Sequence, residues 1–262
     1  MNKKIGFIGY GNMAKAMVTG ILTQFAPENI MVSDLQTPQD VRGINTTTNN
    51  KSVALFADIL VIATKPNQYQ DVIKEIKNDL KPETIVVSIA AGLTIKTLEN
   101  LLGPSVKLVR AMPNTPAMVG LGMTGIMPNN LMTDADTRLV QELFATFGKV
   151  EIVDESLIDA VIVTSGSSPA YLYMMMEAMI KGGIAEGMSR EMATNFVTQA
   201  VMGAAQMVVS SDESPNKLRD NVCSPNGTTI EAVKSLQHAN FEEIVMTAMK
   251  ACADRSREMA KE

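Results

Sequence analysis

A glycine-rich turn near the start of the chain constrains the fold more than any other feature. Its residues, Gly9-Tyr10-Gly11-Asn12-Met13-Ala14, follow the apolar run 5–8 and precede a segment with apolar residues at helical spacing. Gly9 permits a tight turn, Gly11 lets the backbone approach a pyrophosphate, and Ala14 still allows close packing of helix and strand. The N–H groups that open the helix then face the phosphates. The pattern predicts a dinucleotide-binding turn; the alternative is a glycine-rich turn between core elements.

The first 154 residues repeat this alternation of strand and helix. We expect strands at 5–8, 30–32, 58–64, 85–89, 106–110 and 150–153, a further segment of the same unit at 122–127, and helices at 13–24, 68–80, 95–102 and 134–147. Strands separated by helices imply crossover connections and a parallel sheet. Because the strands are apolar throughout, we expect both faces of the sheet to be buried. The fold class is α/β, with a Rossmann-type domain at residues 1–154.

The remaining residues, 155–262, show only helical patterns. We expect helices at 157–163, 170–185, 190–209, 229–236 and 241–261. Several are apolar nearly all round and rich in methionine, which is typical of buried helices. About 100 residues offer little material to bury them, so the pattern favours an all-α domain that dimerises over a compact isolated bundle.

Composition and charge exclude several classes of function. The net charge of the 262 residues is −5 and the basic residues are scattered, which argues against nucleic-acid binding. One histidine and two cysteines are too few for a zinc site, so we expect no metal, and a Ser-His-Asp hydrolase would depend on His238 alone. The longest apolar runs, such as 58–64, are far shorter than the roughly 20 residues that cross a bilayer. With two cysteines and no targeting segment, a cytoplasmic location is expected.

An acidic residue lies where the second strand is expected to end. Asp34 follows Ala14 by 20 residues, the spacing at which a carboxylate meets the adenosine ribose. A carboxylate there accepts a hydrogen bond from a free 2′-OH and repels a 2′-phosphate, and Arg42 is too far along the chain for a confident phosphate contact. Asp34 therefore favours NADH over NADPH; the alternative is that it only caps the turn.

Three later segments are expected at the same edge of the sheet. Ala63-Thr64-Lys65-Pro66 and Ala90-Ala91-Gly92 follow the strands at 58–64 and 85–89, and Arg110–Pro116 follows the strand at 106–110. Ligand crevices of open parallel sheets lie at the carboxyl ends of the strands, and small residues there leave room for a flat ring. The amide of Asn114 is a candidate cofactor contact, whereas Lys65 fits a surface role equally well.

The segment 218–229 is the most unusual part of the helical half. Pro225-Asn226-Gly227 predicts a turn, after which Thr228 or Thr229 caps a helix. Hydroxyls and free backbone N–H groups that converge in this way hold a small carboxylate without arginine. The alternative is an ordinary loop with an N-cap.

Six motifs together resemble the pyrroline-5-carboxylate reductase family. They are Gly9-x-Gly-Asn-Met-Ala14, Lys65-Pro66, Ala90-Ala-Gly92, Arg110-x-Met-Pro-Asn-Thr-Pro-Ala117, Ser165-Gly-Ser-Ser-Pro-Ala-Tyr171 and Asp220-Asn-Val-x-Ser-Pro-x-Gly-x-Thr229. They occur in order along essentially the whole chain. The resemblance implies reduction of 1-pyrroline-5-carboxylate to L-proline with NADPH or NADH. It also implies a Rossmann domain followed by helices that interlock in a homodimer, often within a larger ring of dimers.

The resemblance also assigns roles to individual residues. The turn from Ser224 to Thr229, including Gly227 and Thr228, would bind the substrate carboxylate, with Thr229 near the ring nitrogen. Asn221 would contact substrate or cofactor, Asn50 would lie by the adenosine, and the nicotinamide end would be lined by Ala63, Thr64, Lys65, Pro66, Ile89, Ala90 and Ala91. Two departures stand out: Ser168 replaces a common glycine, and Asn226 and Thr228 replace a common glycine and alanine. Asparagine tolerates left-handed backbone geometry, so we expect the turn to keep its shape.

The implied chemistry is hydride transfer to the carbon of a cyclic C=N bond. Because an iminium accepts hydride better than a neutral imine, the substrate either binds protonated or takes its proton from water positioned by Thr229, and we expect His238 to be structural. Two rival functions remain. A β-hydroxyacid dehydrogenase uses a lysine with an asparagine four residues later, but Lys181 is followed by Ala185. A redox sensor without activity has no need of the turn at 224–229.

Overall fold

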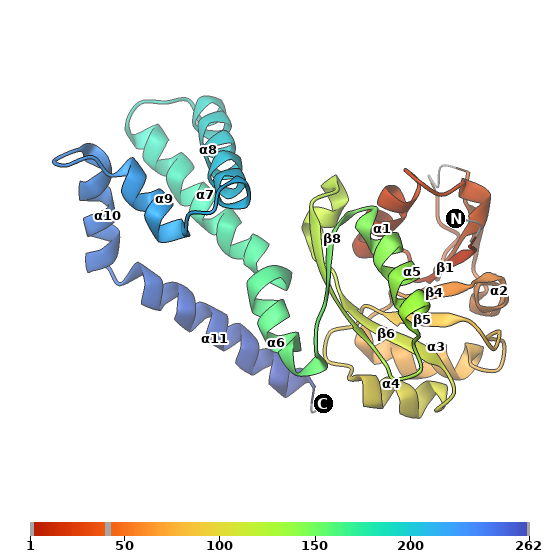
Figure 1. Cartoon of the computed structure of the whole chain (residues 1–262). Coiled ribbons are helices and arrows are strands. Elements are labelled where there is room, and N and C mark those ends of the chain that lie inside the picture. The colour runs from red at the N-terminus through yellow and green to blue at the C-terminus, as the bar shows by residue number, and fades with distance from the viewer. Residues whose placement is uncertain (1–2, 40–42, 261–262) are drawn as a thin grey trace. The chain divides into compact units, whose positions relative to one another are not determined.

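The computed structural model describes residues 3–39 and 43–260, and these form two compact units. Unit 1 comprises the chain up to Ser167 together with the residues from Cys252 onward. Unit 2 comprises Ser168–Ala251. Each unit has its own elements and is described separately (Figure 1).

Unit 1 is built on one eight-stranded sheet with the order β3-β2-β1-β4-β5-β6-β7-β8. The strands are β1 (Ile5–Ile8), β2 (Ile30–Ser33), β3 (Asn45–Thr47), β4 (Ile59–Ile62), β5 (Ile85–Ser88), β6 (Lys107–Met112), β7 (Gly122–Pro128) and β8 (Gly148–Ile152). All neighbours pair in parallel except β6 and β7, which are antiparallel. The expectation of a parallel sheet is therefore wrong at this pair. Only residues 113–121 join the two strands, too few for the helical crossover that a parallel pair requires.

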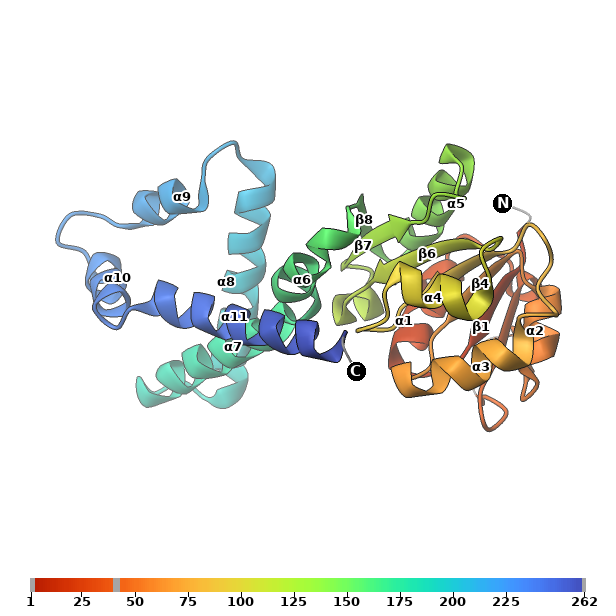
Figure 2. The same ribbon diagram turned by 90° about the horizontal axis from the view of Figure 1, so that it is seen from below.

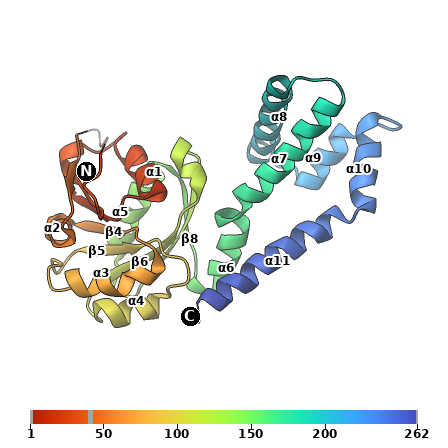
Figure 3. The ribbon, with the colours of Figure 1, turned by 180° about the vertical axis from the view of Figure 1, so that it is seen from behind.

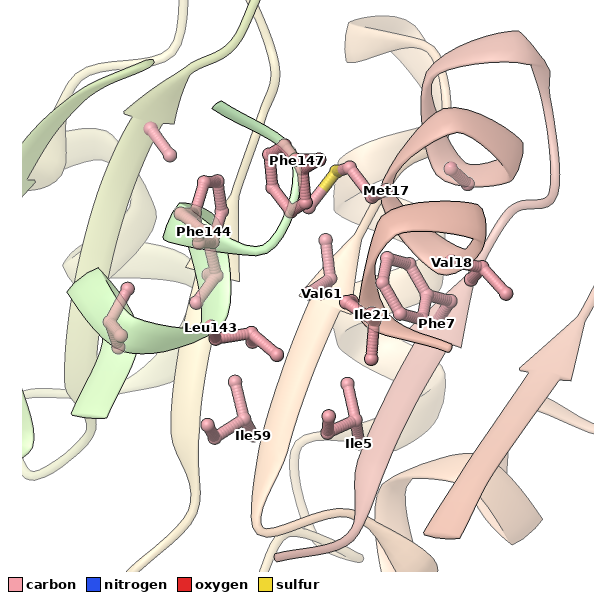
Figure 4. Packing of buried hydrophobic residues seen from close by; sticks show 14 of the residues in the cluster. Ile5, Phe7, Met17, Val18, Ile21, Ile59, Val61, Leu143, Phe144 and Phe147 are labelled. Atoms are coloured by element: carbon pink, nitrogen blue, oxygen red, sulfur yellow. The ribbon is translucent and has the colours of Figure 1, made fainter. Parts of the chain in front are cut away.

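Helices cover both faces of this sheet. They are α1 (Asn12–Ile21), α2 (Asn50–Phe56), α3 (Tyr69–Ile76), α4 (Ile95–Leu102) and α5 (Asp134–Ala145). Helices α1 and α5 pack on one face against alternate strand residues such as Phe7 and Val61 (Figure 4). Helices α2, α3 and α4 pack on the other face against the intervening residues, such as Ile8 and Leu60. This alternation confirms that both faces are buried.

The sequence patterns missed two elements of unit 1. Strand β3 has only three residues and is mostly polar, so it carries no apolar run. Helix α2 has seven residues, and its start is marked by Asn49, whose side chain accepts hydrogen bonds from the backbone N–H groups of Lys51 and Ser52. Both are shorter than the stretch over which periodicity is informative.

Unit 1 extends beyond the predicted boundary at residue 154. The sheet ends with β8, but α6 (Ile158–Val161) and the π-helix η5 (Ile162–Gly166) still belong to the unit. The end of α11 (Phe241–Met259) returns to them: Asp159 Oδ1 accepts from Ser256 Oγ at 2.7 Å, and Asp159 Oδ2 pairs with Arg257 Nε at 3.1 Å. Figure 3 shows the end of α11 beside α6. The residue-154 boundary therefore marks the end of the sheet rather than the end of the compact unit.

Unit 2 is entirely helical over its described residues. It contains α7 (Ser168–Ala185), α8 (Arg190–Ser210), α9 (Pro215–Val222), α10 (Thr228–His238) and the first part of α11 (Figure 2). Only Ile180, Ala193 and Val197 form a buried cluster, between α7 and α8. Large apolar side chains of the same helices are exposed in the single chain, among them Met174 at 75% and Phe196 at 64%.

Helix α9 was not predicted, because its sequence is mostly polar and only Leu218 and Val222 form an apolar pair at helical spacing. Among the described residues, no helix combines the length and the apolar character that a membrane span needs.

Candidate active site

The glycine-rich turn lies where the connections of the sheet reverse direction. From β1 the chain runs outward through β2 and β3, and from β4 it runs the other way through β5 and β6. Gly9 has a φ of +91°, and a Cβ built on it would meet the carbonyl carbon and oxygen of Ala63 at 2.8 Å. Ala63 N in turn donates to Ile8 O at 2.8 Å. A glycine is therefore required at position 9, at the switch point where open α/β sheets bind ligands.

Gly11 and the start of α1 leave space for a phosphate. A Cβ on Gly11 would meet no atom within 4 Å, and Gly11 is the N-cap of α1 without a side-chain hydrogen bond. The N–H groups of Asn12, Met13 and Ala14 therefore open the helix, and its first turn has no acidic residue to repel an anion. These features fit the pyrophosphate of a dinucleotide.

Asp34 lies beside this turn, as the sequence predicted. Its Oδ2 accepts from Tyr10 N at 2.8 Å and its Oδ1 accepts from Leu35 N at 2.7 Å. Behind it, Ser33 Oγ donates to Asn50 Oδ1 at 2.8 Å, and Asn50 Nδ2 donates to Glu75 Oε2 at 2.8 Å. Asn50 is thus tied to the end of β2, and its contact with adenosine stays a prediction. Arg42 is outside the described residues.

One buried polar atom lies directly after β4. Thr64 Oγ1 is shielded from solvent and has no hydrogen-bond partner among the described residues. A buried hydroxyl without a partner is uncommon in proteins, and a ligand amide or hydroxyl would satisfy it. Ala63 and Thr64 are half-buried, whereas Lys65 and Pro66 are exposed at the start of the short 3₁₀ helix η2 (Pro66–Gln68). The residues present at this edge therefore fit a dinucleotide.

The ends of β4 and β5 are held by a hydroxyl network that the sequence analysis missed. Tyr69 Oη donates to Ile62 O and accepts from Ser88 Oγ at 3.1 Å, and Ser88 Oγ accepts from Ala90 N at 3.4 Å. Burial raises the pKa of the Tyr69 hydroxyl well above its usual range, although the hydrogen bond from Ser88 lowers it. Tyr69 therefore joins the end of β4 to Ser88 at the end of β5, directly before Ile89, Ala90 and Ala91. A tyrosine at a core position of a helix gives no sequence signal for this role.

Asn114 and Arg110, in contrast, make structural contacts. Asn114 Nδ2 donates to Ser165 O at 3.1 Å and its Oδ1 accepts from Met123 N at 2.8 Å, so its amide joins the π-helix η5 to β7. Arg110 is buried and pairs with Glu155 Oε1 at 2.7 Å. Cofactor binding by Asn114 stays a prediction, and Arg110 lies inside unit 1 instead of lining a crevice.

The turn at 224–229 lies in unit 2 and has the expected form. Asn226 has a φ of +59°, which asparagine tolerates, and Gly227 N donates to Ser224 O at 3.0 Å. A Cβ on Gly227 would come within 2.3 Å of Ser224 Oγ, so glycine is required there.

The N-cap of α10 is Gly227, whose backbone is extended. The expectation that Thr228 or Thr229 caps the helix is therefore wrong, because both threonines already belong to its first turn. Their backbone N–H groups open the helix directly after Gly227, which lies against the Ser224 hydroxyl, and such a helix start suits a carboxylate.

Asn221, the predicted site residue that precedes this turn, contacts a carboxylate. Asn221, in α9, donates from Nδ2 to Glu213 Oε2 at 2.7 Å. This pairing could not be predicted, because α9 itself was not.

His238 is exposed at the end of α10. In the part of the chain that the structure describes, no three His, Cys, Asp or Glu side chains are grouped to hold a metal.

Comparison with protein families divides the chain in a similar way. Residues 155–259 match the family model described as pyrroline-5-carboxylate reductase dimerisation. Residues 4–92 match the model described as NADP oxidoreductase, coenzyme F420-dependent. The Rossmann-type first half and the dimerising helical second half are thereby confirmed.

Individual proteins match along their full length. The pyrroline-5-carboxylate reductase of Escherichia coli (strain K12) is 44% identical, with all of both chains covered. That of Methanosarcina acetivorans is 39% identical over 99% of both chains. Among solved structures, Plasmodium falciparum pyrroline carboxylate reductase with NADP bound has a TM-score of 0.93 at 33% identity, covering 99% of this chain and 98% of that one. The Coxiella burnetii reductase has a TM-score of 0.92 at 35% identity, with both chains fully covered. The chain therefore belongs to the pyrroline-5-carboxylate reductase family.

Proposed function

We propose that the chain catalyses the reaction of its family, the reduction of 1-pyrroline-5-carboxylate to L-proline that completes proline synthesis. The observation that supports this is the presence of two turns that open a helix without a side-chain cap, one in each unit. The turn at Gly9–Met13 suits the pyrophosphate of NADH or NADPH, and the turn at Ser224–Thr229 suits a small carboxylate. A dehydrogenase of this kind needs one turn for each reactant.

The residues of unit 1 hold and orient the cofactor, which supplies the hydride. The first turn of α1 would hold the pyrophosphate, and Asp34 would accept from the adenosine ribose. Thr64 Oγ1 is the buried hydroxyl that a cofactor amide or hydroxyl would satisfy. Ala63, Ala90 and Ala91 are small and would leave room for the nicotinamide ring at the ends of β4 and β5.

The residues of unit 2 hold the substrate. The N–H groups of Thr228 and Thr229 and the hydroxyl of Ser224 bind the carboxylate, and no arginine is required. The Thr229 hydroxyl contacts the ring nitrogen, which carries a proton when the imine accepts hydride. Alignment of the imine carbon with the hydride donor is the main contribution of the protein, since hydride transfer itself belongs to the cofactor.

The match of residues 155–259 supports assembly into a homodimer through unit 2. A larger ring of dimers and a cytoplasmic location remain proposals. The second is in keeping with two cysteines, Cys223 and Cys252, that form no disulfide.

The test is the initial rate of NADH and NADPH oxidation with 1-pyrroline-5-carboxylate as acceptor. Turnover with either cofactor, and formation of L-proline in equal amount, is the expected result. Folded protein that binds a dinucleotide but oxidises it with no cyclic imine, five- or six-membered, would overturn the proposal and favour a sensor.

A further inference from the structure

The carboxylate of Asp34 is held in a fixed direction beside the glycine-rich turn. Each of its two oxygens accepts one backbone N–H, from Tyr10 at 2.8 Å and from Leu35 at 2.7 Å. A carboxylate oxygen has two acceptor sites, so each oxygen retains one for a ligand hydroxyl. The side chain is half-buried and directly follows β2, whose Ser33 pairs in register with Ile8 of β1.

A hollow of about 410 Å³ adjoins this carboxylate. It is lined by Tyr10, Lys15, Asp34 and the residues 35–39. The segment after Asp34 is Leu35-Gln36-Thr37-Pro38-Gln39, which contains no basic side chain. Among the lining residues, the single cation is Lys15, whose Nζ lies 5.7 Å from the centre of the Tyr10 ring. Besides the Lys15 ammonium, these lining residues offer acceptors and neutral groups where a ribose 2′-substituent is expected.

We propose that this chain prefers NADH to NADPH and that Asp34 is the residue that sets the preference. The proposal rests on the proposed function only for the kind of ligand, a nicotinamide dinucleotide. A free 2′-OH donates to the unused acceptor sites of Asp34. A 2′-phosphate has no proton to donate, carries about two negative charges, and meets an ionised carboxylate instead. Specificity of this kind combines an attractive contact for one ligand with repulsion of the other.

Lys15 is the group that opposes this preference. An ammonium attracts a 2′-phosphate, but Lys15 is exposed on α1 and its interaction is screened by solvent and salt. The half-buried Asp34 is screened less. The Asp34 contribution should therefore dominate, and the preference should shrink as salt concentration rises.

The test is direct binding of NADH and NADPH to the full-length protein, followed by the fluorescence of the reduced nicotinamide. For the unchanged protein we expect the Kd for NADPH to exceed the Kd for NADH by roughly 30-fold at low salt, the size of a screened like-charge contact. Asp34→Asn keeps an acceptor for Tyr10 N or Leu35 N and removes the charge. It should lower the Kd for NADPH by roughly tenfold and raise the Kd for NADH several-fold.

Two further variants complete the design. Asp71→Asn removes a charge from an exposed position of α3, outside the hollow, and should leave the ratio of the two Kd values unchanged. Lys15→Gln should widen the preference for NADH. Equal or tighter binding of NADPH by the unchanged protein, or an unaltered ratio in Asp34→Asn, would overturn the proposal.

The binding experiment is independent of catalysis. Selective binding of NADH without turnover would leave the role of Asp34 intact and count against the proposed function. Turnover with 1-pyrroline-5-carboxylate at a higher kcat/KM for NADPH would support the function and overturn the preference.

Discussion

Single residues carry the chemistry of the two turns, and Thr229 is the most informative of them. It lies in the first turn of α10, where a backbone N–H has no partner within the helix. Thr229→Ala should lower kcat/KM for 1-pyrroline-5-carboxylate by roughly 100-fold, since it removes the contact to the reacting nitrogen that we propose. The Kd of the dinucleotide should stay within about twofold, because its contacts lie in unit 1.

Thr229→Ser is the matched control, because it retains the hydroxyl and should recover most of the activity. Steady-state kinetics and dinucleotide binding, measured on all three proteins, separate the two effects. An unchanged kcat/KM in Thr229→Ala would remove this residue from the mechanism.

Gly20 shows how tightly α1 is packed against the segment after α5. A Cβ at this position would lie 2.5 Å from Phe147 Cβ and 3.0 Å from Thr146 O. Gly20→Ala gains helix propensity but overlaps a buried aromatic, so we expect it to lower the free energy of unfolding by about 1–3 kcal/mol. Thr19→Ala, at an exposed site of the same helix, tests the propensity gain alone and should be close to neutral. Urea denaturation of both variants is the measurement, and a stabilised Gly20→Ala would contradict this packing.

At the residue scale, the sequence predicted what depends on local backbone geometry. The backbone geometry at Gly9, Asn226 and Gly227 follows from the residue types that tight turns require. A few neighbouring residues in the sequence are enough to predict it. The contacts of Asn114 and Tyr69 join segments that are distant in sequence, such as Asn114 with Ser165. No local pattern encodes such a pairing, and these roles became visible only in the fold.

Among the elements, the last turns of α11 have the most specific anchor. Asp159 accepts from Ser256 Oγ and pairs with Arg257, both on α11, and Cys252 Sγ donates to Ser167 Oγ at 3.2 Å. Asp159→Ala should loosen these turns by roughly 1 kcal/mol, since its partners are partly exposed. Amide hydrogen exchange of residues 252–259 should then be about fivefold faster.

Glu258→Ala is a suitable control for that experiment. Glu258 pairs with Arg255 on the same helix, so its removal breaks no contact with α6. Its exchange rates should stay close to those of the unchanged protein. Equal protection in Asp159→Ala would show that apolar packing alone holds the end of α11.

Long elements with a regular pattern were predicted well, and short or polar ones were not. The helix predicted at 190–209 is α8, which has 21 residues and begins directly after Ser189, whose side chain caps it. Strand β3 and helices α2 and α9 are short, and α9 is polar. Their stability derives from the neighbours against which they form, which is information that the local sequence lacks.

For the molecule as a whole, the exposed apolar faces of α7 and α8 predict that a charge placed on them weakens the dimer. Phe196 is 64% exposed in the single chain and lies within the residues that match the dimerisation family. Phe196→Lys should raise the dissociation constant of the dimer by roughly 30-fold or more, because aromatic residues contribute strongly at such interfaces.

Gln70→Lys adds the same charge on α3 of unit 1 and should leave the dimer intact. Light scattering during size-exclusion chromatography, at several protein concentrations, measures both. A Phe196→Lys protein that stays dimeric at the lowest concentration would place the contact on another face.

The acid stability of the whole molecule should depend on Asp58. Burial raises the pKa of the Asp58 carboxyl. Hydrogen bonds from Lys4 N and from Lys81, together with the charge of Lys81, lower it by a larger amount, so the folded pKa lies below the ordinary value of 3.8. A carboxyl whose pKa is lower in the folded than in the unfolded protein stabilises the fold at pH values above the unfolded pKa. This stabilisation is lost as the pH falls through the folded pKa. The free energy of unfolding should therefore decrease as pH drops from about 5 to below 3.8.

Asp58→Asn should lower the free energy of unfolding at neutral pH and flatten its decline in this acidic range. Asp71→Asn, at an exposed site without these hydrogen bonds, should follow the unchanged protein. Urea denaturation at a series of pH values checks both statements. A slope identical in Asp58→Asn would assign the acid sensitivity to other carboxyls, such as Asp136, whose pKa is also lowered.

The return of α11 to unit 1 has a consequence for how the protein is made. A ribosome synthesises the sheet first, the helices of unit 2 next, and the residues from Cys252 onward only afterwards. Asp159 on α6, the partner of both Ser256 and Arg257, therefore keeps its carboxylate in water while more than eighty intervening residues emerge from the exit tunnel. Completion of the nucleotide-binding unit is in this way delayed until the dimerising helices are already outside the ribosome, so maturation of the two units is coupled in time.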